Sequence, residues 1–122
     1  MKLRFRANSL RLRVNRREVE ALAAGQVLRE CVRFPGSELI YSLEPVNETE
    51  PRATFEKNTI RILAPAAEVE RWWSATDAVG LYFDLDTGRE PLRLMIEKDL
   101  ECVDGPPEER DPHAFPRSAK SC

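Results

Sequence analysis

The residues best suited to chemistry lie at the start of the chain, where basic side chains alternate with apolar ones. Lys2, Arg4 and Arg6 alternate with apolar residues in "KLRFRA", and Arg11 and Arg13 do so in "LRLRV". A period of two places such side chains on one face of a strand. Two such strands paired as a hairpin would form a basic ribbon that suits phosphate contact and fits the major groove of B-DNA. The alternative is a solvated face whose arginines pair with nearby glutamates.

The net charge of the whole chain conceals this basic end. The formal net charge is −2 and the calculated pI is near 5.5. Of the 19 lysines and arginines, seven lie in residues 1–17, which hold no acid, so 12 remain against 21 acidic residues. A basic segment on an acidic chain indicates an anionic partner for that segment. An acidic total argues the other way, because free-standing nucleic-acid binders are often basic.

Other reactive residues do not form an arrangement typical of an enzyme. His113 is the single histidine, and there is no Gly-rich phosphate loop or Ser–His–Asp pattern. The "DLDTG" stretch at 84–88 resembles the first half of a calcium loop but lacks the acidic twelfth ligand, so a hairpin turn explains it better. The spacing of Cys102, His113 and Cys122 matches no zinc pattern. We therefore expect no catalysis, metal or cofactor, and thiols that suit a reducing cytosol.

Two adjacent tryptophans lie in an expected helix. Neighbours on a helix point about 100° apart, so only one can be central to the core. Trp72 is predicted to pack in the core and Trp73 to lie at its edge, where contact with a ligand or partner is the alternative.

The elements that would position these residues are written twice. "NSLRLRV" at residues 8–14 returns as "NTIRILA" at 58–64, and a shift of fifty also places Phe5 on Phe55 and Val19 on Val69. With small gaps, the later positions of the two copies match as well: Leu28, Val32 and Phe34 fall on Val79, Phe83 and Leu85, and Leu39, Tyr41, Leu43 and Glu44 fall on Leu92, Leu94, Ile96 and Glu97. Such self-similarity predicts a tandem duplication, with repeat 1 at 1–45 and repeat 2 at 51–103.

Each repeat reads as strand, strand, helix, strand, strand. Two-residue alternation predicts the strands, and the tips of the first hairpin in each repeat fall at "AN" and "KN". Asn15 followed by Glu18 predicts a capping box, a helix from Arg16 and an end near Gly25. Pro65 suits the first turn of the second helix.

The repeat resembles the AbrB/MazE swapped-hairpin family, whose usual pattern runs G-N-S-x-x-x-R-[IV]-P, a helix, and then G-D-x-V. "ANSLRLRVN" keeps Asn8, Ser9, Arg13 and Val14, and "KNTIRILAP" keeps the asparagine and the proline. "TDAV" and "GQVL" resemble the G-D-x-V strand. Neither copy has the glycine before asparagine, and Leu63 stands at the arginine position of the second copy. The opening residues are also similar to small bacterial proteins of unknown function.

The resemblance implies a fold and a site. Two copies in one chain would supply both halves of an intertwined dimer, giving a covalent pseudo-dimer barrel; double-psi and RIFT barrels remain alternatives. Relatives use the first hairpin on DNA, which implies contacts from Arg4, Arg6, Asn8, Arg11 and Arg13. MazE-type antitoxins also hold a toxin with an acidic C-terminal segment, and by composition the tail resembles it, which implies a basic protein partner with Phe115 as an anchor. The alternative is a tail that only increases solubility.

We therefore expect a mainly β (α+β) protein: a pseudo-twofold small β-barrel at 1–103, built from two strand-strand-helix-strand-strand repeats, followed by an acidic, Pro-rich flexible tail at 104–122. The expected function is that of a non-enzymatic, cytoplasmic bacterial module that binds DNA as a regulator. The alternative is a protein-interaction or scaffold barrel without DNA binding. The expected partners are DNA and a basic protein, with no membrane, and the expected state is a monomeric pseudo-dimer or a homodimer.

Overall fold

The alternation seen in the sequence becomes eight strands and two helices in the computed structural model, which describes residues 1–99, 113 and 115. The elements are β1 (Lys2–Arg6), β2 (Ser9–Val14), α1 (Arg16–Ala23), β3 (Leu28–Phe34), β4 (Ser37–Val46), β5 (Arg52–Glu56), β6 (Thr59–Pro65), α2 (Ala66–Ser74), β7 (Gly80–Leu85) and β8 (Leu92–Lys98). The order strand, strand, helix, strand, strand occurs twice, as the sequence predicted.

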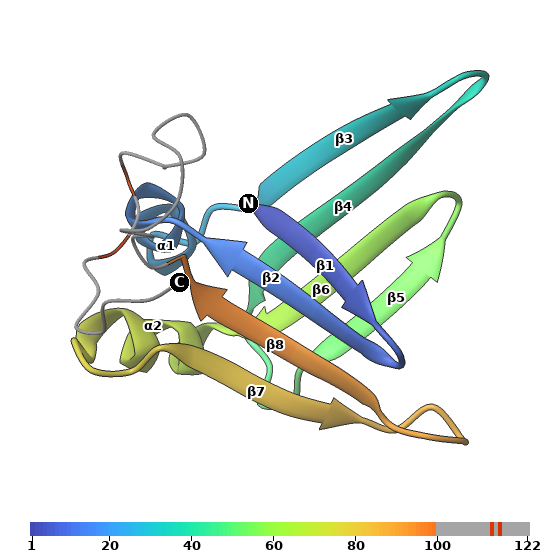
Figure 1. The fold of residues 1–122 in the computed structure, drawn as a ribbon. Helices are drawn as coiled ribbons and strands as arrows, with labels where there is room; N and C mark the ends of the chain where they lie inside the picture. Colours follow the sequence, from blue (N-terminus) through green and yellow to red (C-terminus); the bar gives the residue numbers. More distant parts are fainter. Residues whose placement is uncertain (100–112, 114, 116–122) are drawn as a thin grey trace.

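The strands form two four-stranded sheets with related orders (Figure 1). One sheet has the order β1-β2-β8-β7 and the other has β3-β4-β6-β5. Each sheet joins two antiparallel hairpins through a parallel central pair, β2 with β8 or β4 with β6. Replacing each strand of the first half by its counterpart in the second half converts one sheet order into the other. Each sheet therefore takes one hairpin from each half of the chain.

The described strands do not close into the expected barrel. β1 and β7 end one sheet and β3 and β5 end the other, so each has a ladder partner on one side among the described residues. The sheets face each other near the helices and diverge toward the hairpin tips (Figure 1). Because of this divergence, neither β1 with β3 nor β5 with β7 forms the ladder that would complete a barrel. The mainly β fold with two helices is confirmed, but barrel closure is not.

The core lies between the sheets and beneath the two helices, which cover the end of the molecule away from the hairpin tips (Figure 1). Trp72 is 2% exposed and its Nε1 donates to the Val79 carbonyl at 3.1 Å, whereas Trp73 is 36% exposed. The predicted division between a core and an edge tryptophan is confirmed. The other residues of the central cluster are Leu10, Leu12, Val14, Val19, Leu22, Leu43, Ile62, Ala64, Val69, Leu94 and Ile96.

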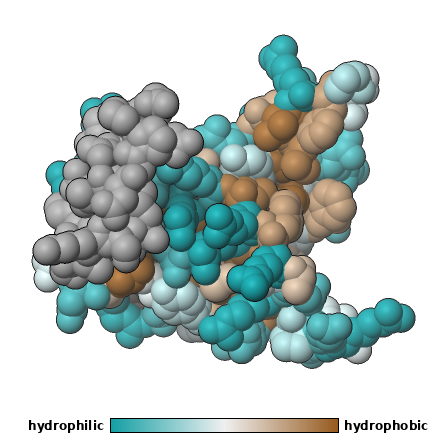
Figure 2. Space-filling model, in the orientation of Figure 1, coloured by the Kyte–Doolittle hydropathy of each residue, from teal (hydrophilic) through white to brown (hydrophobic). Residues whose placement is uncertain are grey.

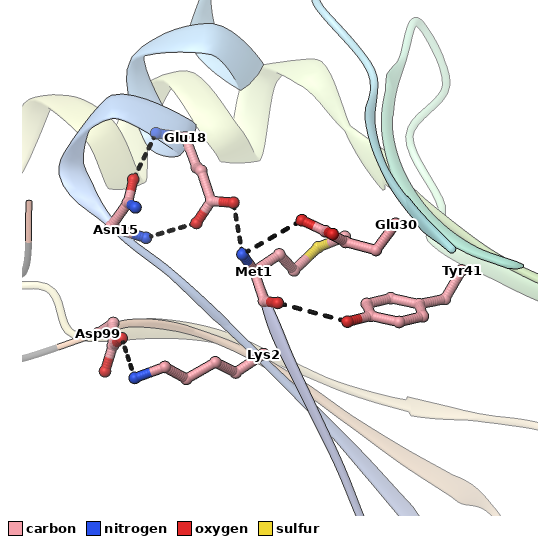
Figure 3. Close-up of polar contacts among 7 residues, drawn as sticks. All are labelled: Met1, Lys2, Asn15, Glu18, Glu30, Tyr41 and Asp99. Atoms are coloured by element: carbon pink, nitrogen blue, oxygen red, sulfur yellow. Dashed lines mark hydrogen bonds and ion pairs between the residues drawn. The ribbon is translucent and has the colours of Figure 1, made fainter. Parts of the chain in front are cut away.

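The first helix begins with the predicted capping box, which also holds the start of the chain (Figure 3). The Asn15 side chain accepts from the Glu18 backbone N–H at 2.9 Å, and Glu18 Oε1 accepts from the Asn15 N–H at 2.9 Å. The other carboxylate oxygen of Glu18 accepts from the Met1 ammonium at 2.5 Å. Glu30 Oε1 lies 3.7 Å from that ammonium, and the Tyr41 hydroxyl donates to the Met1 carbonyl at 3.4 Å. These contacts tie the start of β1 to α1, β3 and β4.

Both first hairpins turn through a left-handed residue immediately before asparagine. Ala7 and Lys57 each have φ of +49°, and Asn58 follows Lys57 with φ of +59°. In the first hairpin the left-handed residue is therefore Ala7, at the position where the AbrB/MazE pattern has glycine.

Two residues of the predicted tail are described, and both contact the folded domain. The Arg16 N–H donates to the His113 carbonyl at 2.8 Å, and the Phe115 N–H donates to the Asp99 carbonyl at 2.8 Å. The Phe115 ring packs against the core cluster. Phe115 therefore packs on its own chain instead of standing free for a partner. The rest of the tail at 104–122, with its acidic residues, lies outside the described residues.

Candidate nucleic-acid interface

The register of the first hairpin brings the predicted basic residues onto one face. Across β1 and β2 the partners are Lys2 with Arg13, Arg4 with Arg11, and Arg6 with Ser9. The intervening residues Leu3, Phe5, Leu10 and Leu12 lie on the opposite face, toward the core cluster. We call the face formed by Lys2, Arg4, Arg6, Arg11 and Arg13 the basic face.

Two of the five basic side chains form ion pairs with acids at the end of β8 or directly after it. Lys2 Nζ lies 2.8 Å from Asp99 Oδ2. Arg11 Nε lies 3.2 Å from Glu97 Oε1, without the alignment of a hydrogen bond. Arg4, Arg6 and Arg13 are exposed and form no ion pair with a described residue. Within the described part of the chain, no acid neutralises these three guanidinium groups.

Asn8, the remaining predicted contact, is engaged within the protein. Its side-chain Nδ2 donates to the backbone carbonyls of Glu90 at 3.2 Å and Pro91 at 2.9 Å. The backbone carbonyl of Asn8 accepts from the Arg93 N–H at 3.0 Å. Asn8 therefore fixes the tip of the first hairpin to the connection between β7 and β8. Its role in the site is to position the turn.

The basic face holds like charges directly opposite each other. Lys2 faces Arg13 and Arg4 faces Arg11 across the ladder. Like charges at such positions destabilise a strand pair. In the second hairpin the corresponding partners are Arg52 with Leu63 and Thr54 with Arg61, so no like-charged pair forms there.

Arg61 of the second hairpin forms an ion pair with Glu44 that was not predicted from the sequence. Arg61 donates through Nε at 2.8 Å and through its terminal nitrogen at 2.9 Å to the two oxygens of Glu44. These hydrogen bonds, aided by one from Ser42 Oγ at 2.9 Å, lower the pKa of Glu44, and Glu44 in turn raises the pKa of Arg61. The repeat was the available signal, because an offset of fifty places Arg61 on Arg11 and, after small gaps, Glu44 falls on Glu97.

A buried lysine lies where β8 meets the helices, and its contacts fit a structural role. Lys98 is 6% exposed, and its ammonium donates to the Ala75 carbonyl at 2.9 Å. The ammonium lies 6.0 Å from the ring centroid of Trp72 and 5.2 Å from that of Phe115, within the range of cation–π attraction. Burial lowers the pKa of Lys98. The carbonyl and the two rings together compensate for the lost hydration of this charge.

An apolar groove opens between the two sheets near the hairpin tips, and it was not predicted from the sequence. It encloses about 390 Å³ and is lined by Phe5, Leu10, Leu39, Ala53, Thr54, Phe55, Ile60, Ile62 and Leu92. The aromatic side chains at its mouth, Phe5 and Phe55, are 59% and 71% exposed. Figure 2 shows apolar atoms gathered in the hollow between the sheets and along the β3–β4 hairpin. Alternation predicts which residues share a face of a strand, but it cannot tell where two sheets separate.

Within residues 1–99, neither helix has the length and apolar character needed to cross a bilayer. No three acidic, histidine or cysteine side chains among the described residues lie close enough together to hold a metal ion. Cys102 and Cys122 lie outside those residues.

A family model matches residues 1–119, nearly the whole chain. The chain belongs to DUF7009, a family of unknown function. No curated protein matches this DUF7009 chain, and no solved structure matches it. The function of this DUF7009 member is therefore argued from the basic face and the groove.

Proposed function

We propose that this chain is a non-enzymatic, cytoplasmic AbrB/MazE-like module that binds nucleic acid through the basic face of its first hairpin. The observation that carries the proposal is the placement of like charges across β1 and β2, Lys2 with Arg13 and Arg4 with Arg11. Three guanidinium groups of this face are exposed and have no acidic partner among the described residues.

The charge pattern favours an external anion for a physical reason. A pair of like charges directly opposite each other costs the sheet up to about 1 kcal/mol. A phosphate backbone would relieve that repulsion and release counterions on binding. Arg4, Arg6 and Arg13 would make the phosphate contacts, Arg11 would stay anchored on Glu97, and Asn8 would hold the hairpin tip in place.

The exchange of hairpins supports the finer relationship to swapped-hairpin proteins. Each sheet combines a hairpin from residues 1–46 with one from residues 52–98. A single chain containing two copies of one unit would fold in this way, as a pseudo-dimer. The duplication and the AbrB/MazE kinship are part of the proposal.

The test is fluorescence anisotropy of the full chain with a labelled duplex DNA of mixed sequence, titrated at several salt concentrations. The double variant Arg4→Ala/Arg13→Ala removes two free charges from the basic face. The matched control, Arg52→Ala/Lys57→Ala, removes two charges from exposed positions of the second hairpin. We expect the first variant to reduce the slope of log K against log salt by up to about two, since each lost phosphate contact changes it by about 0.9.

The control distinguishes a site from a general charge effect. It should leave affinity and salt slope close to those of the parent protein. Absence of binding by the parent at low salt would refute the proposal, and so would equal losses in the two double variants.

A second function is favoured by a different observation, the apolar groove. A groove of this size, with exposed phenylalanines at its mouth, is typical of an interaction surface. The second candidate is therefore a protein-interaction module without nucleic-acid binding. A basic protein partner for the acidic tail stays a prediction.

A further inference from the structure

We propose that the free edge of β3 and the apolar groove beside it receive an extended segment of another protein, in which apolar and acidic residues alternate. The segment would pair with β3 as an added strand, with its apolar side chains toward the groove and its acidic side chains outward. This proposal does not depend on nucleic-acid binding, because it uses another edge and another face.

The edge of β3 offers both backbone and apolar contacts. β3 is the last strand of its sheet and pairs with β4 alone among the described strands, so its other side can form a ladder. Exposed edges of this kind are templates for strand addition. Val32 and Phe34 are 41% and 54% exposed and lie on the face of β3 that turns toward the other sheet. Val32 is the cross-strand partner of Leu39, which lines the groove, so the apolar surface is continuous from the groove to the edge.

The opposite face of the same strand selects the charge of the added segment. Arg29, Cys31 and Arg33 alternate with the inward residues, which are Leu28, Glu30, Val32 and Phe34, and point outward. Arg33 is largely exposed, and its Nε lies 4.0 Å from Glu38 Oε1, the limit of an ion pair. Acidic side chains of a neighbouring strand would lie beside these arginines, and opposite charges at such positions stabilise a sheet. The edge therefore favours acidic residues on the outward side.

β7, the corresponding edge of the other sheet, has neither the exposed apolar residues on its inward face nor the basic residues on its outward face. Its inward residues Phe83 and Leu85, which match Val32 and Phe34 in the repeat, are half-buried. Its outward residues are Tyr82 and Asp84, and Asp84 would repel an acidic strand. Of these two corresponding edges, β3 is therefore the one that fits an added strand of alternating apolar and acidic residues.

β1 and β3 start close together and end far apart (Figure 1). Met1 lies against Glu30 and Tyr41, which holds the beginnings of β1 and β3 together. From there the strands diverge toward the hairpin tips (Figure 1), and Phe5 and Phe34, near those tips, are exposed. An added strand would pair with the part of β3 that has diverged from β1.

The experiment uses the full chain labelled with ¹⁵N and a synthetic peptide as long as β3, seven residues, with Glu alternating with Val or Phe. Two further peptides are compared: one of the same composition with the acids grouped, and one with Lys in place of Glu. We expect the alternating acidic peptide to bind best, to shift the amide signals of residues 28–34 and to slow their hydrogen exchange.

Variants then distinguish peptide binding at the edge of β3 from peptide binding in the groove alone. Val32→Ser/Phe34→Ser should lower the affinity for the peptide by about tenfold or more, because an aromatic anchor is lost. It should leave DNA binding unchanged. Phe55→Ser removes an exposed ring of β5 at the mouth of the groove and should weaken peptide binding less than Val32→Ser/Phe34→Ser does, because β5 does not pair with the peptide. Arg29→Glu/Arg33→Glu should reverse the preference toward the lysine peptide. Because all these side chains are exposed, the variants should fold.

Three results would overturn the proposal. The first is peptide binding that Phe55→Ser weakens as much as Val32→Ser/Phe34→Ser does, with no protection of β3 amides. The second is displacement of the peptide by oleate regardless of Arg29 and Arg33, which would make the groove a lipid site. The third is no peptide binding but a dimer in sedimentation that Val32→Ser/Phe34→Ser dissociates, which would make the occupant a second copy of this chain.

Discussion

The two first hairpins, β1–β2 and β5–β6, share a backbone design but differ in how their arginines are neutralised. Arg61 donates hydrogen bonds to both carboxylate oxygens of Glu44, at 2.8 and 2.9 Å. Arg11 occupies the equivalent place in the first hairpin, yet it meets Glu97 through one contact at 3.2 Å. Glu97 also accepts from the Tyr82 hydroxyl at 2.8 Å, and burial together with this bond raises the pKa of Tyr82.

Equivalent backbones in the two hairpins therefore carry arginines that differ in their ion pairs. The second hairpin satisfies its central arginine internally and has no like-charged partners across its ladder. In the first hairpin Arg4, Arg6 and Arg13 form no ion pair with a described residue, and like charges face each other across the ladder, which weakens it. A difference in side chains, on equivalent backbones, therefore separates a structural hairpin from a candidate binding hairpin.

The largest expected effect tests whether the two hairpins are equivalent in the core. Leu12 and Ile62 occupy matching positions, and each is 1% exposed. Truncation of either to alanine should lower the free energy of unfolding by about 2–5 kcal/mol, through lost burial and the cavity left behind. Chemical denaturation of Leu12→Ala and Ile62→Ala measures both losses. A loss below about 1 kcal/mol in one half alone would show that its core is not equivalent.

A smaller effect is expected at the hairpin tips, where the two halves share a left-handed residue. Ala7 and Lys57 have φ of +49°, a conformation that costs residues with a Cβ about 1–2 kcal/mol. Ala7→Gly and Lys57→Gly should each raise the free energy of unfolding by about 0.5–1 kcal/mol, because part of that gain is offset by the larger unfolded-state entropy of glycine. Denaturant titration of both variants measures the change, and Ala23→Gly within α1 serves as the destabilising control. Destabilisation by Ala7→Gly would contradict this account of the turn.

The smallest expected effect sharpens the contrast between the ion pairs and depends on pH. Arg61 holds the pKa of Glu44 below its ordinary value of 4.5, so the charged form stabilises the folded state. That contribution is present above the unfolded pKa and is lost as the pH falls through the lower folded pKa. The stability advantage of the parent protein over Glu44→Gln should therefore shrink as the pH falls below 4.5.

The partner variant provides the control for this pH effect. In an Arg61→Gln background, the same comparison should show a much weaker dependence on pH, because the main cause of the lowered pKa is gone. An advantage of the parent that stayed constant from neutral to acidic pH would contradict the assignment.

Local features were predictable because their causes are local. Asn15 and Glu18 form the capping box, since its two hydrogen bonds lie within one helical turn. Trp72 and Trp73 divide between core and edge because neighbouring helical residues point in different directions. The alternation of Arg4 with its apolar neighbours fixed the faces of β1 correctly, as the register with β2 shows.

Features that depend on distant elements were not predictable in the same way. The bonds of Asn8 join residues more than eighty positions apart, so its engagement by Glu90 and Pro91 had no local signal. Phe5 and Phe55 occupy core-facing positions of their strands and are nevertheless exposed, because the sheets separate there. No local signal indicates that Phe115 lies beside Lys98, whose ammonium is 5.2 Å from the centroid of its ring.

The sequence by itself determined the elements, their order and the inner face of each strand, because side-chain periodicity follows from backbone geometry within a few residues. Only the tertiary structure decided which hairpins share a sheet, which arginines find an acid, and how far the sheets diverge. Those outcomes depend on long-range pairing, such as β2 with β8 and β4 with β6, whose geometry no short stretch encodes. The free charges of the basic face and the apolar groove beside β3 both arise at that level.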